Sequence, residues 1–464
     1  MQAMEGCCVK LSIRQPARLA WLAVLIAAGA MLLSASGAQA AANRGAVLVK
    51  DINAGRSGSS SGYIGGCYAC YAYGGPFASV GGTLYLSVDD GKHGYELWRS
   101  DGTGKGTRMV KDINPGPGSS YVYGATVVNR ILYFAADDGV HGFELWRSDG
   151  TAPGTMMVKD INPGADTSYF EGGIAIGGIL YFWARGGLWR SDGTEAGTSL
   201  VKQLSGGLYP IIDVNGTLYF GLFDGGHSGL WRSDGTEAGT ILVKQGFLGT
   251  LEFTNFNGAL YFSGNDGVHG TALWRSDGTQ FGTTMVKEFN TTNPSLPCCF
   301  FEANSILYFL SSDAAYALDQ LWRSDGTAAG TILLKRGFFE LSAVKSILYL
   351  AGARGLWRSD GTPRGTKLVR KGVVVVSLTA AKKTLYFVGT DKQHGEEVWR
   401  SDGTRKGTNV ARDIRRGPAS SHPQDLTAVG GTLFFTAKEG KHGRELWRAG
   451  PKPCTTAKGK CKKG

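Results

Sequence analysis

The residues best suited to chemistry recur in one kind of loop. The pattern Asp-Gly-x-His-Gly stands at residues 90–94, 138–142 and 266–270. Six of the seven histidines occupy this loop or a related form of it: His93, His141, His227, His269, His394 and His442. Neighbouring carboxylates such as Asp89 and Asp90, together with Glu96, are the oxygen ligands that Ca²⁺ prefers in proteins.

These loops are therefore candidate binding sites, with Ca²⁺ as a candidate ligand. A single loop supplies few ligands and the EF-hand spacing is absent, so hydrogen bonding within the turn is the simpler interpretation. The identity of any metal stays open, and no other cofactor is indicated. The candidate binding residues are Asp89, Asp90, His93, Asp137, Asp138, His141, Asp266, His269, His394 and His442.

Other reactive groups give weaker signals. Glu171, Glu252, Glu302 and Glu340 fall in or near predicted strands, but no isolated pair of acids stands out as a glycosidase would need. We therefore predict that the chain is not an enzyme. Six cysteines follow the first 40 residues, and we expect local pairs Cys67–Cys70 and Cys454–Cys461 in an oxidising compartment. Cys298 and Cys299 are adjacent, so a bridge between them would be strained.

A repeat positions these loops. The segment Leu-Trp-Arg-Ser-Asp-Gly-Thr or a close variant recurs along the chain, and a ninth copy stops after its Arg. The spacings between successive tryptophans run from 35 to 48 residues, which is typical of repeat architectures. We expect these tryptophans to be structural core: Trp98, Trp146, Trp189, Trp231, Trp274, Trp322, Trp357, Trp399 and Trp447.

Each unit is predicted to hold four short antiparallel strands, a to d. In the first unit these are residues 77–80, 83–88, 95–99 and 107–113. Gly-Gly and Asn-Gly pairs between strands a and b suit a type I′ hairpin turn. Strand b is almost continuously apolar, as expected of a sheet that is covered on both faces.

Four antiparallel strands in about 42 residues describe a β-propeller blade. Residues 47–52 resemble a strand d that lacks its strand c, and residues 445–448 resemble a strand c that lacks its strand d. Pairing between them would close the ring. The sequence thus predicts an all-β fold, a single β-propeller at residues 46–449 with nine four-stranded blades, or eight as the fallback.

The formal net charge of +11 raises the question of a polyanionic partner. Eighteen of the 49 lysines and arginines belong to the repeat frame, one after each Trp and one in each strand d. No nucleic-acid motif accompanies the charge, so we expect no nucleic-acid partner.

The two ends of the chain carry their own signals. Residues 1–40 resemble a signal peptide, with a basic start, an apolar run at 19–33 and Ala38-Gln39-Ala40 as the cleavage site. We therefore expect a protein that is secreted or located at the cell surface or in the periplasm, with no stable membrane span after cleavage. Residues 450–464 form a basic tail that contains two cysteines.

The chain resembles the ELWxxDGT repeat proteins, which are secreted or surface-associated bacterial proteins. The literal pattern stands at residues 96–103 and 144–151, and the resemblance spans roughly residues 46–449. Five other units lose the Glu, while Glu397 keeps it next to Val398. The resemblance implies no catalytic residues.

In such blades the b–c loops and d–a connections share one face of the ring, and this face holds the variation between units. We therefore expect a non-enzymatic binding or scaffold protein that presents this face to a glycan, a cell-surface protein or a surface polymer. The alternatives are a propeller enzyme acting on an extracellular glycan and a purely structural envelope or matrix component. The oligomeric state stays open.

Overall fold

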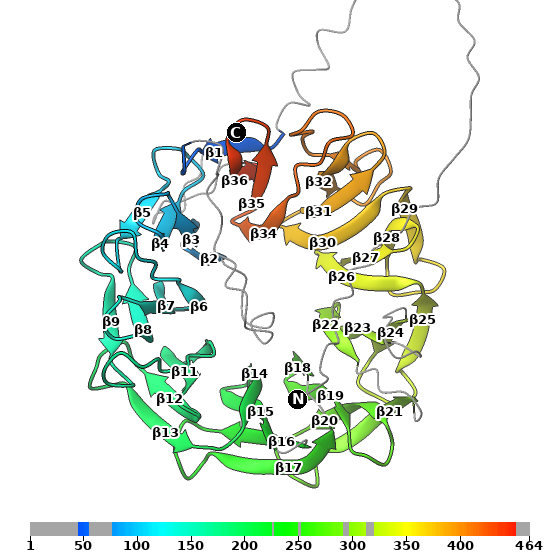
Figure 1. Cartoon of the computed structure of the whole chain (residues 1–464). Coiled ribbons are helices and arrows are strands. Elements are labelled where there is room, and N and C mark those ends of the chain that lie inside the picture. Colours follow the sequence, from blue (N-terminus) through cyan, green and yellow to red (C-terminus); the bar gives the residue numbers. More distant parts are fainter. Residues whose placement is uncertain are drawn as a thin grey trace, which may run out of the picture.

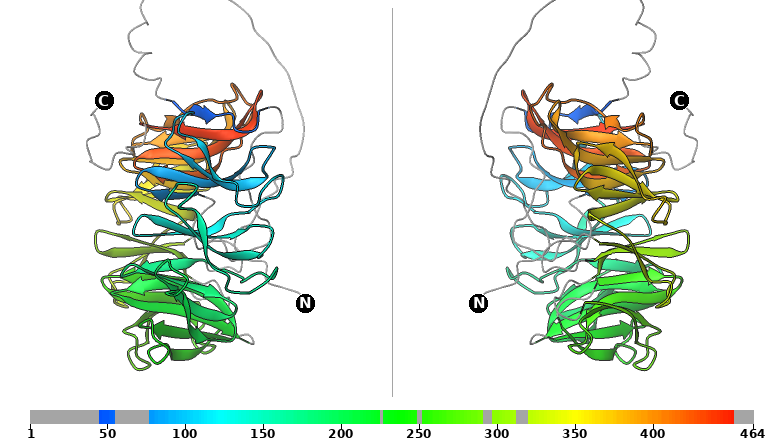
Figure 2. Two further views of the ribbon diagram at one scale, coloured as in Figure 1. Left: turned by 90° about the vertical axis from the view of Figure 1, so that its left-hand side faces the viewer. Right: turned by 90° about the vertical axis from the view of Figure 1, so that its right-hand side faces the viewer.

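The computed structural model describes residues 45–54, 77–224, 227–248, 252–290, 297–311 and 320–451. In these residues the regular secondary structure is all β-strand, and it forms nine four-stranded antiparallel sheets. The sheets stand as blades around a ring (Figure 1), which Figure 2 shows from its edge. The nine-bladed β-propeller predicted from the sequence is confirmed, and the fallback of eight blades is wrong.

Eight blades follow one another along the chain, each running from an inner strand to an outer strand. Blades 1 to 3 are β2 (Phe77–Val80), β3 (Thr83–Asp89), β4 (Tyr95–Ser100), β5 (Arg108–Lys111); β6 (Tyr123–Val128), β7 (Ile131–Asp137), β8 (Phe143–Ser148), β9 (Met156–Lys159); and β10 (Gly173–Ile176), β11 (Ile179–Ala184), β12 (Gly187–Ser191), β13 (Ser199–Gln203). Blades 4 and 5 are β14 (Gly207–Val214), β15 (Thr217–Asp224), β16 (His227–Ser233), β17 (Ile241–Leu248); and β18 (Glu252–Phe256), β19 (Ala259–Asn265), β20 (Thr271–Ser276), β21 (Thr284–Asn290).

The remaining blades keep the same order. Blades 6 and 7 are β22 (Cys298–Ala303), β23 (Ile306–Ser311), β24 (Gln320–Ser324), β25 (Ile332–Arg336); and β26 (Phe338–Val344), β27 (Ile347–Gly352), β28 (Gly355–Ser359), β29 (Lys367–Lys371). Blade 8 is β30 (Val374–Ala381), β31 (Thr384–Asp391), β32 (Gly395–Ser401), β33 (Asn409–Val410), and blade 9 is β34 (Gln424–Val429), β35 (Thr432–Glu439), β36 (Gly443–Ala449) with β1 (Val47–Lys50).

Blade 9 closes the ring with strands from both ends of the chain. β1 pairs antiparallel with β36, with Leu48 opposite Trp447 and Val47 opposite Arg448. The two strands lie side by side in Figure 1, as the truncated last repeat predicted. Closure removes the two exposed blade faces that an open stack would leave.

Strand b of each blade is buried on both faces by the neighbouring blades. In β7, Leu132 and Phe134 pack toward blade 1, while Tyr133 and Ala135 pack toward blade 3. The core of the described residues accordingly divides into nine apolar clusters, one for each seam between blades. Each blade is therefore stable only against its neighbours.

Strand d is shorter than the sequence predicted. β5 ends at Lys111, because the next two residues turn toward the following blade. A β-bulge also recurs between strands c and d, where Trp98 lies opposite Met109 but Leu97 lies opposite Lys111. The extra residue, Val110, is buried against blade 2. The sequence did not reveal this bulge.

The tryptophan of each strand c forms part of a seam. Trp274 is 4% exposed, stacks on Phe262 and meets Phe247 edge to face with ring centroids 5.3 Å apart. Its indole Nε1 donates to the Gly264 carbonyl at 3.3 Å. Removing this side chain would leave a large cavity between blades 4 and 5.

We predict that Trp274→Ala lowers the free energy of unfolding by about 3–5 kcal/mol, the usual cost of removing a buried aromatic side chain. Thermal and urea unfolding of the full chain would measure the loss. Phe281→Ala is the matched control, because Phe281 belongs to the same blade and is 95% exposed. Equal stability of the two variants would contradict the assignment of Trp274 to the core.

Candidate functional site

The repeat motif itself serves the packing of the ring. Of the nine tryptophans, Trp98, Trp146, Trp274, Trp399 and Trp447 are buried, and the other four are half-buried. No tryptophan of this set, all of which lie in the described residues, forms an exposed aromatic array.

The basic residues of the frame tie each blade to the next. Lys50 donates from its Nζ to the Thr107 carbonyl at 2.8 Å and lies 5.5 Å above the ring of Trp98. Arg99 donates to the Gly150 carbonyl of blade 2 at 2.9 Å. Corresponding bonds recur around the ring from Lys111, Lys159, Lys202, Lys244, Lys335, Arg147 and Arg323. Much of the positive charge is therefore engaged between blades.

The Asp-Gly-Thr turn between strands c and d is also self-contained. Asp101 Oδ1 accepts hydrogen bonds from the backbone N–H of Thr103 at 2.9 Å and from its hydroxyl at 2.7 Å. The Thr103 hydroxyl oxygen in turn accepts from the Gly106 N–H. The same bonds recur in the other blades, so this side of the ring is nearly uniform.

The opposite side holds the Asp-Gly-x-His-Gly loops. Asp90 Oδ1 accepts from the N–H groups of Lys92 and His93, and Asp90 Oδ2 lies 2.9 Å from His93 Nδ1. Burial alone would raise the pKa of the Asp90 carboxyl, but the hydrogen bonds with His93 and Lys92 lower it below its usual value. The hydrogen bond with Asp90 raises the pKa of the His93 imidazole.

The same carboxylate–histidine pair recurs in other blades. Its members are Asp138 with His141, Asp266 with His269, Asp391 with His394, and Glu439 with His442. In blades 1 and 2 the preceding aspartate serves the loop as well, since Asp89 and Asp137 each accept the N–H of a loop glycine at 2.7 Å.

This geometry bears on the calcium hypothesis. The predicted oxygen ligands Asp89 and Asp90 bond to their own loop, and Glu96 is fully buried elsewhere in the blade. Within the described residues, no group of three or more His, Cys, Asp or Glu side chains is placed to hold a metal ion.

Glu96, the first residue of the repeat motif, anchors the d–a connection. Its carboxylate accepts the backbone N–H groups of Ile113 at 2.8 Å, Asn114 at 3.3 Å and Ser120 at 3.1 Å. The same connection is bonded to two strands. The Ser120 N–H also donates to the Tyr95 carbonyl, and the Ser120 carbonyl accepts from the Asp137 N–H. One buried side chain thus fixes the whole of residues 112–122.

Four blades share this anchor. The equivalents of Glu96 are Glu144, which accepts from Ile161 and Asn162, Glu397, which accepts from Arg415 and Ser421, and Glu445, which accepts from Ile52. Burial raises the pKa of both Glu96 and Glu144 to about 7, against the N–H donors that lower it.

A sequence signal for this anchor exists, and our sequence interpretation missed it. The motif Glu occurs in the units whose strand d is followed by Asp-Ile, at residues 51–52, 112–113, 160–161 and 413–414. The five units that replace Glu by Gly, Ala or Gln lack that Asp-Ile pair. The motif Glu and the Asp-Ile pair occur together because the Glu carboxylate binds the backbone at this pair.

The four anchored blades are consecutive in the ring: blades 8, 9, 1 and 2. Their d–a connections are long, at residues 411–423, 51–76, 112–122 and 160–172, whereas blade 3 uses only 204–206 and blade 6 only residue 337. Together with the b–c loops of these blades, the described parts of the connections (411–423, 51–54, 112–122 and 160–172) form one surface, which we call the long-loop arc. Variation between units is therefore concentrated in one part of one face.

Aromatic rings are exposed at equivalent places on the long-loop arc. Tyr121 is 40% and Tyr169 is 70% exposed, and in blade 8 the corresponding residue is His422. All three have positive φ, at 45°, 51° and 48°. A bulky side chain in this conformation is uncommon and costs free energy, so its recurrence suggests a functional demand.

Three of the four acids predicted near the inner strands lie outside the long-loop arc, and Glu171 lies within it. Glu252, Glu302 and Glu340 belong to β18, β22 and β26 of three consecutive blades, while Glu171 precedes β10. Burial raises the pKa of Glu171, Glu252 and Glu340. Glu340 accepts the Leu378 N–H at 2.6 Å and so bridges to blade 8.

The adjacent cysteines lie on β22, between two of these acids. The sulfur atoms of Cys298 and Cys299 are 2.8 Å apart. Their hydrogen bond lowers the pKa of the Cys299 thiol, whereas burial and the charges of Glu252 and Glu340 raise it. The predicted pairs Cys67–Cys70 and Cys454–Cys461 lie outside the described residues, as do the predicted signal segment 1–40 and the tail from residue 452 onward.

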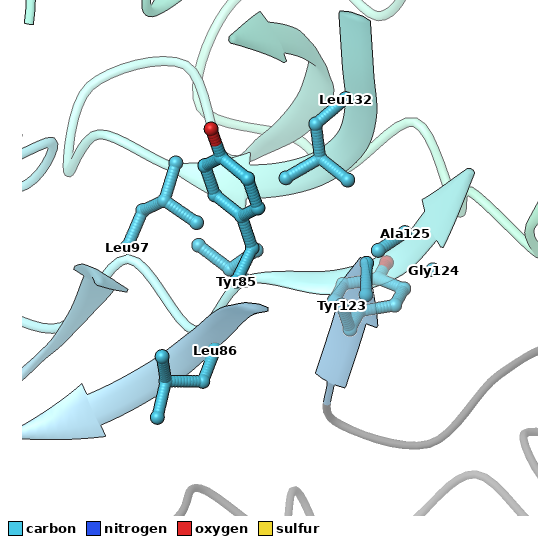
Figure 3. A pocket seen from close by; sticks show the side chains of 9 residues that line it. Tyr85, Leu86, Leu97, Tyr123, Gly124, Ala125 and Leu132 are labelled. Carbon is cyan, nitrogen blue, oxygen red and sulfur yellow. The ribbon is translucent and has the colours of Figure 1, made fainter. Parts of the chain in front are cut away.

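A small cavity near the centre of the ring belongs to the packing of blades 1 and 2. Its volume is about 20 Å³, roughly the room for one water molecule. Figure 3 shows the Tyr85 ring beside Leu97 and Leu132 at this seam, with Tyr123 nearby. The walls are largely apolar, so this is a packing void and not a ligand site.

Comparisons with known proteins do not identify a family for this chain. No family model and no curated protein matches the chain. Among solved structures it is similar to puromycin hydrolase (TM-score 0.41, 12% identity, 84% of this chain and 60% of that one) and to a Mycobacterium tuberculosis puromycin-hydrolyzing peptidase (0.43, 11%, 78% and 57%). The chain therefore spans about three fifths of the length of these proteins. It is also similar to the AfRom2 CNH domain (0.35, 10%, 60% and 93%). In the described residues no helix is long and apolar enough to cross a membrane.

Loss of the Glu96 carboxylate leaves the N–H groups of Ile113 and Asn114 without their acceptor, while the Ser120 N–H keeps the Tyr95 carbonyl. At about 1 kcal/mol or more for each lost bond, we predict that Glu96→Ala costs about 2–3 kcal/mol and raises hydrogen exchange in residues 112–122. Glu195→Ala is the control, because Glu195 is exposed in a c–d turn. Unfolding free energies and amide exchange measure both effects, and unchanged exchange in 112–122 would contradict the anchor.

The loss in unfolding free energy caused by Glu96→Ala depends on pH. The folded-state pKa of Glu96 is raised to about 7 from 4.5, so folding favours the protonated carboxyl. The stability that this group contributes is therefore fully present below about pH 4.5 and declines as pH rises to 7. We expect Glu96→Ala to cost more at pH 5 than at pH 8, and the reverse order would refute the raised pKa.

Proposed function

We propose that this chain is a non-enzymatic, exported binding or scaffold protein that presents the long-loop arc to a glycan-bearing surface or polymer. The observation that carries the proposal is the recurrence of exposed rings at positive φ on three of the four anchored blades, namely Tyr121, Tyr169 and His422. Tyr121 stacks on Tyr95 with ring centroids 5.7 Å apart, and the exposed parts of Tyr121 and Tyr169 offer ring surface to a ligand.

The chemistry of the arc suits a carbohydrate. Sugar rings present apolar C–H faces that pack on aromatic rings, and hydroxyl groups that need hydrogen-bond partners. The Asp–His pairs at residues 90–93 and 138–141 supply such partners beside the rings. Loops fixed on a rigid scaffold keep the entropy cost of binding low. The resemblance to the ELWxxDGT repeat proteins and the export signal at residues 1–40 stay predictions that are consistent with this use.

The alternative is an enzyme acting on an extracellular glycan. One observation favours it: Glu252 and Glu340 both influence the pKa of Cys299, so acids of two different blades approach the same inner strand. Release of reducing sugar ends from a polymer that the protein binds would support this alternative. A protein that binds no glycan and fractionates with the cell envelope would support the purely structural role.

We predict that the mature chain binds a subset of glycans or envelope polymers and that the double variant Tyr121→Ala, Tyr169→Ala lowers the affinity at least about tenfold, which corresponds to about 1.4 kcal/mol. A glycan array followed by calorimetry, with and without Ca²⁺, would measure it. Alanine tolerates positive φ no better than tyrosine, so the backbone strain is unchanged.

The control for this experiment is Phe281→Ala, which removes an even more exposed aromatic side chain from a c–d turn on the uniform side of the propeller. We expect this variant to bind like the parent protein. Binding that the double variant retains in full, or that Phe281→Ala reduces equally, would rule out the long-loop arc as the binding surface.

A further inference from the structure

A second surface departs from the repeat frame, at the outer rim between blades 7 and 8. There a cavity of about 360 Å³ opens beside β29 and β33. Its lining residues are Arg370, His394, Trp399, Arg400, Asn409 and Val410. Two guanidinium groups, an imidazole and an amide thus surround one space, and no carboxylate lines it.

Two departures from the frame accompany this cavity, a smaller residue and a shorter outer strand. In every blade one residue of strand d lies opposite the motif tryptophan. In the other eight blades this residue is Met or Leu: Leu48, Met109, Met157, Leu200, Leu242, Met285, Leu333 and Leu368. In blade 8 it is Val410, opposite Trp399, and β33 comprises only Asn409 and Val410. The cavity lies beside this short strand.

The two arginines lack the hydrogen bonds that residues at the same positions make in several other blades. Where other blades have a lysine that donates to a threonine carbonyl of the next blade, Arg370 lies 5.4 Å above the ring of Trp399 and forms no hydrogen bond within the described residues. Arg400 donates from Nε to Asn409 Oδ1 at 3.3 Å, which leaves its two terminal nitrogens unpaired in that part of the chain. Arg99 and Arg147 use this end of the side chain to bond a glycine carbonyl.

The remaining groups fix the pocket in place. His394 Nδ1 lies 3.0 and 3.1 Å from the two oxygens of Asp391, and its ring meets Trp399 edge to face at 6.0 Å. Trp399 is 1% exposed and bonds the Gly389 carbonyl, so it forms a rigid floor and leaves little ring surface for a ligand. Asp402 is the nearest acid in sequence to Arg400, but its Oδ1 bonds Thr404 in the turn.

We propose that this pocket binds an oxyanion group, a carboxylate or a sulfate or phosphate ester, carried by a ligand or by the polymer at the protein surface. Guanidinium groups present paired N–H donors that match the oxygens of such groups, and charge-assisted bonds of this kind are the strongest that side chains form. Both arginines are half-buried and neither forms an ion pair with an acid within the described residues, so a bound anion would supply the opposite charge that they lack. The pocket shares His394 with the edge of the long-loop arc but contains neither Tyr121 nor Tyr169, so each proposal can fail without the other.

The test is calorimetry of the mature full chain with sodium sulfate, sodium phosphate and sodium glucuronate at fixed ionic strength, with glucose as the neutral probe. We expect saturable binding of at least one anion at one site and none of glucose. The anion that binds most tightly distinguishes an ester from a carboxylate source. Arg400→Gln and Arg370→Gln should each weaken binding at least about tenfold.

Two further variants separate a built pocket from general positive charge. Val410→Met restores the residue size found in other blades, keeps the charge and narrows the cavity beside Trp399, so it should weaken binding with the thermal midpoint retained or raised. Arg275→Gln removes the exposed arginine at the same register of blade 5 and should leave the affinity unchanged. The proposal is overturned if no anion saturates the parent protein, if Val410→Met binds as the parent does, or if Arg275→Gln weakens binding equally.

Discussion

The structure depends on burial of both faces of every blade by its two neighbours. Strand b carries apolar residues in direct succession, for example Leu132, Tyr133, Phe134 and Ala135, and alternate members belong to different seams. A blade with two apolar faces is not stable alone, and an open row of blades would expose one apolar face at each end to water. Closure through β1 and β36 is therefore what makes the other seams stable.

The repeated residues answer demands that every blade shares. Trp fills the seam, Lys and Arg bond carbonyls of the next blade, and Asp and Thr close the c–d turn. Their use in packing explains why a basic composition and many tryptophans do not by themselves indicate a polyanion or a sugar ligand. The motif Glu differs, because it appears only where a long connection must be held, and so it links the frame to the variable surface.

The candidate functional surfaces lie where the frame is altered. On the long-loop arc the alteration is an insertion, supported by a buried carboxylate at the expense of a raised pKa. At the rim of blade 8 it is a smaller residue, Val410 in place of Met or Leu, together with two arginines that lack the hydrogen bonds made in several other blades. Each of these two surfaces arises from small changes within individual repeat units. The rest of the ring supplies the rigid scaffold that a binding site needs.

The sequence by itself determined the number of blades, their strand order and the closure, because these follow from the repeat period and from the two incomplete units at its ends. It also located the histidine loops and the tryptophan frame. Only the tertiary structure showed that Lys50 bonds Thr107, that Arg448 bonds Gly102, and that Glu96 holds residues 112–122. The first two contacts join residues 57 and 346 positions apart, and so depend on how blades are set against one another. The pocket beside Val410 was beyond sequence reasoning for a related reason: a cavity is defined by side-chain volume missing between elements, and that volume exists only once the elements are packed.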